Sequence, residues 1–194
     1  IKMLAEAESG HTASALGTAE IFSTLYFNIL DITPKNFNQN NRDKLIVSGG
    51  HICPIWYAVL SKAGFFEQKE LWKLRKTGHL LQGHPNYTDE KFKNSNIKNI
   101  PGVENNSGSL GQGLSLSIGM AIANKLDNIN KRIYCITGDG ELNEGQIWEA
   151  ALFAANKNVN NLTWIIDYNG IQLDGTTKDI MPLYDLKEKL QSFN

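Results

Sequence analysis

The sequence GDGELNEGQIWEAALFAANKNVNNLTWIIDYNGIQLDG, residues 138–175, decides the fold class. A short apolar run, residues 133–136, comes directly before it with one threonine between, and a second apolar run, residues 162–166, lies within it. Each run ends in a turn that contains glycine, and the residues between the runs carry apolar side chains at helical spacing. Strand, helix and strand in this order predict two successive parallel strands joined by a right-handed crossover.

The same alternation continues outside this stretch. A third apolar run, residues 45–47, ends in the turn SGGH, residues 48–51. Spacings of three and four place apolar side chains on one helical face in two segments outside this stretch and in the segment within it: Leu16, Ala19, Phe22 and Leu25; Leu114, Ile118, Ala121 and Ile122 after Gly113; and, within the stretch, Ile147, Ala150, Ala151 and Ala154. We therefore predict an α/β fold, a doubly wound and mostly parallel sheet buried on both faces by helices. Residues 86–100 are rich in Asn and Lys, so we predict that they form a surface loop.

Composition limits the partners. The chain has 194 residues and a formal charge of −1, so no overall field attracts it to nucleic acid or to an anionic membrane. Its apolar runs are too short to cross a bilayer. Cys53 and Cys135 lie in apolar surroundings, which indicates reduced core residues of an intracellular protein, and we expect it in the cytoplasm. The chain begins at Ile1 and stops after a helix-like segment, so we expect one domain, residues 1–194, truncated at both ends.

Asp139 and Asn169 carry the predicted chemistry. Asn169 follows Asp139 by 30 residues, and each comes after a predicted strand. Parallel neighbouring strands deliver both side chains to the same end of the sheet, where ligands bind in folds of this kind. One carboxylate and one amide oxygen make a weak site alone, but they suit a hard cation that also holds a diphosphate, because Mg²⁺ keeps few protein ligands.

The motif resembles that of the thiamine-diphosphate enzymes, in which GDG is followed by an asparagine roughly thirty residues later. The resemblance implies that Asp139, Asn169 and the carbonyl of Ile171 bind Mg²⁺, or another divalent cation such as Ca²⁺ or Mn²⁺. It also implies that Gly138 and Gly140 belong to the turn that binds the cofactor, thiamine diphosphate.

Other segments are similar to transketolase, in that family's order and over almost the whole chain. They are GHTASALGTAEI (10–21), DKLIVSGGH (43–51), GHP (83–85), VENNSGSLGQGLSLSIGMA (103–121), EG (144–145) and WEAA (148–151). The prolines and one glycine of the usual GHPGAP element are absent from the corresponding GHTASA, which has Thr12, Ala13 and Ser14 after the histidine, and Ser109 replaces the proline of GPLGQG. These forms look more like transketolases split into two polypeptides than like the single-chain type.

The resemblance implies a role for further residues. His11, His51 and His84 would line the channel above the thiazolium ring and contact the donor sugar or the cofactor, His51 among the cofactor-binding residues. Gly108 and Leu110 would contact the aminopyrimidine ring. Glu144 would join a carboxylate network across a subunit interface, and we group it with the three histidines as catalytic.

No segment resembles the pyrimidine-binding domain, whose glutamate drives activation of the cofactor. The resemblance implies that a C-terminal transketolase subunit or domain supplies it, in a homodimer or a heterotetramer, and that the enzyme transfers a two-carbon ketol unit between sugar phosphates, a reaction of the pentose phosphate pathway. Two alternatives stay open. Deoxyxylulose phosphate synthase shares the GDG element, although the GHP and GPLGQG-like segments favour transketolase. A non-catalytic module would keep only the fold.

Overall fold

The chain forms two compact units in a computed structural model that describes residues 1–87, 99–173 and 175–193. The first unit comprises Ile1–Lys44 and Gly50–Gly108, and the second comprises Leu45–Gly49 and Ser109–Asn194. Most of the loop predicted at residues 86–100 lies outside the described residues.

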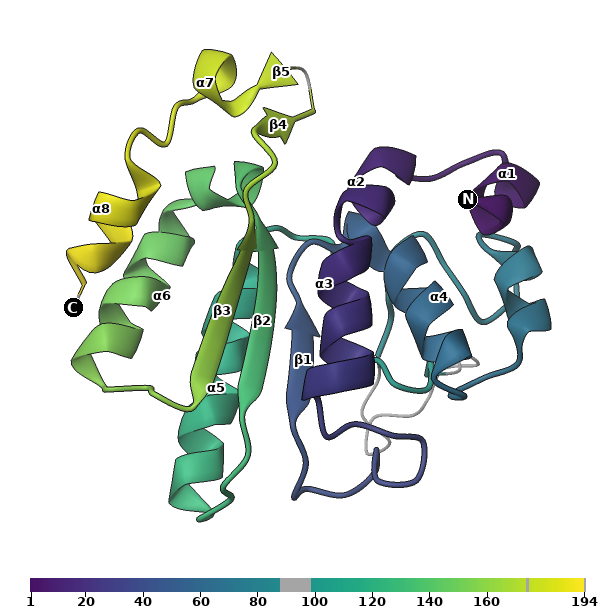
Figure 1. Ribbon diagram of the computed structural model, residues 1–194, viewed down its shortest axis with the longest axis horizontal. Helices are drawn as coiled ribbons and strands as arrows, with labels where there is room; N and C mark the ends of the chain where they lie inside the picture. The colour runs from purple at the N-terminus through teal and green to yellow at the C-terminus, as the bar shows by residue number, and fades with distance from the viewer. Residues whose placement is uncertain (88–98, 174, 194) are drawn as a thin grey trace. The chain divides into compact units, whose positions relative to one another are not determined.

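The first unit is helical over the part that the structure describes (Figure 1). Its elements are α1 (Lys2–Ala7), α2 (Thr12–Gly17), α3 (Ala19–Thr24), η1 (Leu25–Ile29), η2 (Gly50–Ile52), α4 (Cys53–Lys62) and η3 (Gln68–Lys73). Its core centres on Phe22, Trp56 and Tyr57, none of which is exposed. The indole nitrogen of Trp56 donates a 2.6 Å hydrogen bond to the Tyr26 hydroxyl, so the polar end of this buried ring is satisfied.

The helix predicted around residues 16–25 is interrupted at Thr18. α2 ends at Gly17 and α3 begins at Ala19, with Thr18 as the cap of both, and the Thr18 hydroxyl donates to the Ser14 carbonyl at 2.9 Å. Phe22 and Leu25 are buried as predicted, but Leu16 is 48% exposed. The prediction of one continuous apolar face was therefore wrong at its first residue, because the break at Thr18 removes Leu16 from the face that α3 buries.

The second unit contains a three-stranded sheet flanked by helices, and a small hairpin. The sheet has the order β1 (Lys44–Val47), β2 (Ile133–Gly138) and β3 (Leu162–Asp167), and the hairpin joins β4 (Ile171–Gln172) to β5 (Gly175–Thr176). β2 and β3 are parallel, with Ile133 opposite Leu162 and Gly138 opposite Asp167. The remaining elements are α5 (Gln112–Leu126), η5 (Gly140–Asn143), α6 (Gly145–Asn156), α7 (Thr177–Ile180) and α8 (Leu186–Gln191).

The core of the second unit lies between the sheet and the helices α5 and α6. α5 packs on β2, and α6 packs on α5. Figure 1 shows α5 behind β2 and β3. The predicted helical faces of α5 and α6 supply this core with Leu114, Ile118, Ala121, Ile147 and Ala150. The α/β fold class and both of these helices are therefore confirmed.

Burial differs between the strands. The residues Ile133–Ile136 of β2 are all buried, as predicted for a strand covered on both faces. All six residues of β3 are only half-buried, which the sequence did not predict. The reason is position, since β3 is at the edge of the sheet and pairs with β2 alone among the described residues.

Both cysteines are free and buried, as predicted. Burial raises the pKa of the Cys53 thiol to about 12 and that of Cys135 also to about 12, because each thiolate would be poorly solvated. Within residues 1–87, 99–173 and 175–193, no helix has the length and apolar character needed to cross a membrane.

Leu114→Ala tests the core of the second unit. Leu114 is 1% exposed, so its truncation leaves a cavity, and we expect the free energy of unfolding to fall by about 2–5 kcal/mol in chemical denaturation. Leu126→Ala is the matched control on the same helix, where the side chain is 77% exposed and we expect a change within about 0.5 kcal/mol. Equal losses in the two variants would contradict this packing.

Candidate functional site

Backbone hydrogen bonds bring the predicted metal-binding residues together in the second unit. The Asp139 amide donates to the Asp167 carbonyl at 3.0 Å, which extends the pairing of β2 with β3 by one residue. The Gly170 amide then donates to Asp139 Oδ2 at 2.7 Å. Asp139 and Asn169 therefore lie at the carboxyl ends of neighbouring strands, as the spacing predicted. Figure 1 shows these strand ends beneath the β4–β5 hairpin.

Asp139 is 1% exposed, and two backbone amides hold its carboxylate. Besides the bond from Gly170, Oδ1 accepts from the Gly140 amide at 2.9 Å. Burial raises the pKa of Asp139, and the bonds from Gly170 and Gly140 oppose that rise. Because each carboxylate oxygen can accept two hydrogen bonds, acceptor capacity remains for a cation.

Asn169 and Ile171 lie at the next turn. The side-chain nitrogen of Asn169 donates to Asp167 Oδ2 at 3.0 Å. The side-chain oxygen of Asn169 accepts from the backbone amide of Ile171 at 2.9 Å. Asn169 is exposed, and Ile171, the first residue of β4, is 67% exposed.

This donor set fits the expected cation. The described residues contain no group of three or more His, Cys, Asp or Glu side chains placed to hold a metal, so a site made wholly of such side chains is not found there. One carboxylate with amide and carbonyl oxygens suits instead a hard cation whose other ligands are phosphate oxygens and water.

Glu141 is a buried carboxylate that the sequence did not distinguish. It is 3% exposed and accepts hydrogen bonds from the Ser48 hydroxyl, from the Gly111 amide at 2.6 Å and from the Gly138 amide at 3.2 Å. Burial raises its pKa, and these three bonds oppose the rise. Glu144 and Glu149 lie on the same stretch of sequence but are exposed in the structure. Residue type alone does not distinguish Glu141 from these two glutamates.

Glu144 and Leu110, both predicted site residues, lie at neighbouring points of the second unit. Glu144 precedes the first residue of α6 and is exposed. The Leu110 carbonyl accepts from the side-chain amide of Gln146 at 3.1 Å, which ties the residues around Leu110 to the first turn of α6.

The three predicted histidines come together in the first unit. The rings of His11 and His51 contact each other edge to face, with centroids 5.4 Å apart. His84 lies against Gly50 and Gly108, and a Cβ at Gly50 would be only 2.7 Å from His84 Cδ2. Glycine at position 50 is therefore required for His84 to approach the turn that carries His51.

The charges around His84 favour its neutral form. Partial burial lowers the pKa of His84, and the nearby His11 and Arg75 lower it further. A neutral imidazole has one donor and one acceptor nitrogen, so His84 can bind a hydroxyl group in either sense.

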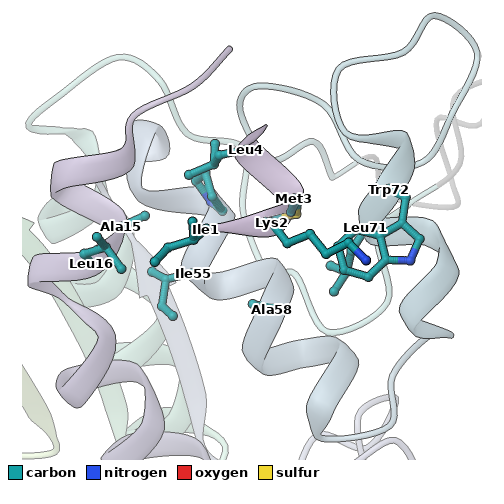
Figure 2. A pocket seen from close by; sticks show the side chains of 11 residues that line it. Ile1, Lys2, Met3, Leu4, Ala15, Leu16, Ile55, Ala58, Leu71 and Trp72 are labelled. Carbon is teal, nitrogen blue, oxygen red and sulfur yellow. The ribbon is translucent and has the colours of Figure 1, made fainter. Parts of the chain in front are cut away.

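A half-open apolar pocket of about 200 Å³ lies elsewhere in the first unit (Figure 2). Side chains of α1, α2, α4 and η3 line the pocket. Two of the lining residues interact, since the Lys2 ammonium group lies over the Trp72 ring, 4.8 Å from its centre. The residues predicted to meet the cofactor, metal or sugar are absent from this lining, so we do not assign the pocket to the site.

Comparison with known proteins decides the family. The family described as "Transketolase, thiamine diphosphate binding domain" matches the whole chain, residues 1–194. The chain belongs to this transketolase family. The fold agrees, since transketolase from Campylobacter jejuni superimposes with a TM-score of 0.87 and 31% identity over 98% of this chain and 29% of that one.

Two bacterial relatives of this transketolase domain are named as subunits. The chain is 39% identical over 184 residues to the 6-deoxy-6-sulfo-D-fructose transketolase subunit SqwG of Clostridium sp. (strain MSTE9). It is 41% identical over 184 residues to a subunit of the apulose-4-phosphate transketolase of Actinobacillus succinogenes. Each alignment covers 95% of this chain and 63% of the relative, so the chain spans less than two thirds of their length.

The pKa of His84 is open to direct measurement. In an NMR titration we expect one imidazole to titrate below the ordinary value of 6.5, and its resonance to disappear in His84→Asn. Arg75→Gln removes a neighbouring positive charge and so should raise that pKa toward 6.5. Lys76→Gln removes an exposed charge one residue away and should leave it unchanged. A pKa of His84 at or above 6.5 in the unaltered chain would contradict this description.

Proposed function

We propose that this chain holds the divalent cation and the diphosphate of thiamine diphosphate in a transketolase. The enzyme would transfer a two-carbon ketol unit reversibly from a ketose phosphate to an aldose phosphate. The observation that carries the proposal is the hydrogen bond from the Gly170 amide to the Asp139 carboxylate, which fixes the GDG turn beside the turn of Asn169.

The oxygen atoms at these two strand ends have separate tasks. Asp139 supplies the negative charge, while the Asn169 side-chain oxygen and the Ile171 carbonyl supply neutral ligands. Gly138 and Gly140 allow the backbone to approach a phosphate group closely. When bound, thiamine diphosphate supplies the carbanion chemistry by which a carbon–carbon bond is broken and formed.

The histidine cluster suits the sugar end of the reaction. We assign hydrogen bonding to substrate hydroxyl groups, and proton transfer at those groups, to His11, His51 and His84. The neutral form of His84, favoured by burial and by Arg75, can accept a proton from a hydroxyl group near neutral pH.

We further infer that this chain supplies only part of the active site. Nothing in its sequence resembles the pyrimidine-binding domain, and the names of the two bacterial relatives describe them as subunits. A second polypeptide or a further domain would then contribute the glutamate that activates the cofactor, and Glu144 would meet that partner.

Asp139→Ala tests the metal site. Loss of the only charged ligand proposed for the cation should abolish Mg²⁺-dependent retention of thiamine diphosphate, measured by cofactor titration with and without Mg²⁺. Asp127→Ala, at an exposed aspartate at the end of α5, should bind the cofactor as the unaltered protein does. An unchanged titration in Asp139→Ala would refute the assignment.

Activity of the chain alone tests the shared site. We expect no ketol transfer by the isolated chain and full transfer once its pyrimidine-binding partner is added, measured with xylulose phosphate as donor. Substantial activity without the partner would show that the site is complete in one chain.

The choice of donor separates the two enzyme classes. A transketolase uses xylulose phosphate, whereas condensation with pyruvate as donor would indicate a deoxyxylulose phosphate synthase. Failure to bind the cofactor even with the partner present would favour a non-catalytic module.

A further inference from the structure

Glu141 connects three turns that are separate in the sequence. Its Oε1 accepts from the Ser48 hydroxyl at the end of β1 and from the Gly111 amide at the start of α5. Its Oε2 accepts from the Gly138 amide at the end of β2. The Ser48 hydroxyl in turn accepts from the Gly113 amide at 3.0 Å. One buried side chain therefore links two strand ends to the first turn of a helix.

The start of α5 makes burial of this charge possible. α5 has 15 residues, and its unpaired amides carry partial positive charge at the N-terminus.

Gly111, the residue before α5, has a φ of 85°. A Cβ at this position would lie 2.7 Å from the Gln146 amide nitrogen and 3.0 Å from Glu144 Cβ. The turn of Leu110 and Gly111 is therefore pressed against the segment that follows the GDG turn.

The Asp139 carboxylate does not need Glu141 for its own position. It is held by the Gly140 and Gly170 amides, and the Asp139 amide is held by the Asp167 carbonyl. Removing Glu141 would take the acceptor from the Gly111 amide on one side and from the Gly138 amide on the other, while the Leu110 carbonyl would keep its bond from Gln146. The metal-binding carboxylate itself would keep its partners.

We propose that Glu141 is a positioning residue for the cofactor: it fixes the turn of Leu110 and Gly111 relative to the metal-binding turn, so that one molecule can meet both. This inference rests on the proposed function, in which Leu110 contacts the aminopyrimidine ring and Asp139 the metal-bound diphosphate. The affinity of a ligand that reaches both turns is increased when the separation of the turns is fixed, whereas the affinity of a ligand that occupies one turn is not.

Glu141→Gln tests this role with little change of shape. The amide keeps one oxygen acceptor, but its NH₂ group faces an amide donor in either orientation. In the full-length protein with its partner chain and saturating Mg²⁺, we expect the affinity for thiamine diphosphate to fall about tenfold, the effect of losing one hydrogen bond to a buried charge. The affinity for inorganic pyrophosphate, which needs only the metal-binding turn, should change less than about threefold.

Two further variants complete the experiment. Ser48→Ala removes the hydroxyl that joins Glu141 to Gly113, and should weaken thiamine diphosphate binding in the same selective way but less. Glu149→Gln makes the same chemical change at an exposed position of α6 and should alter neither affinity. At saturating cofactor, kcat of Glu141→Gln should recover, because the residue positions the cofactor and does not touch the reacting atoms.

The outcomes are distinct. Equal losses for thiamine diphosphate and pyrophosphate would mean that Glu141 only stabilises the fold, and would overturn the positioning role. Unchanged affinities in both Glu141→Gln and Ser48→Ala would also overturn it. Failure of the unaltered protein to bind thiamine diphosphate would instead overturn the proposed function, and the positioning role with it.

Discussion

Hydrogen bonds between β2 and β3 place Asp139 beside the turn of Asn169. Their register sets Gly138 opposite Asp167, the Asp139 amide continues the pairing, and the Gly170 amide closes it on the Asp139 side chain. A shift of one residue would turn Asp139 away from the turn of Asn169. The buried side chains of β2 oppose such a shift, because it would disturb their packing in the core. Core packing therefore determines the geometry of the polar strand ends.

Two buried carboxylates lie two residues apart beside this turn, and they are stabilised differently. Among the described residues, the Asp139 carboxylate accepts from backbone amides of the two turns that it joins, which leaves it able to take a cation. Glu141 has three donors from three segments and is 3% exposed. Burial raises the pKa of both carboxyl groups, and in each case the hydrogen bonds to the carboxylate oppose that rise. A divalent cation at Asp139 would add attraction where burial alone is unfavourable.

The sequence predicted the fold class, the helices α5 and α6, and the places of Asp139 and Asn169 at the ends of neighbouring strands, because all of these follow from local periodicity and from parallel pairing. Family resemblance, and not periodicity, grouped His11 with His51, which lie 40 positions apart in the sequence; the structure shows that their rings are in contact. The break at Thr18 and the half-buried state of β3 could not be predicted. Apolar spacing does not reveal an interruption between two helices or the place of a strand in its sheet. Glu141 was missed because two of its three donors, Ser48 and Gly111, lie 93 and 30 positions away in the sequence.

The state of the two thiols has a practical consequence for experiments on this chain. Cys53 and Cys135 are its only cysteines, both are buried, and burial raises the pKa of each to about 12. Thiolate, the form that reacts with maleimides and iodoacetamides, is therefore scarce at neutral pH. A cysteine introduced at an exposed position would take up a spin label or fluorophore selectively, with the native residues left in place.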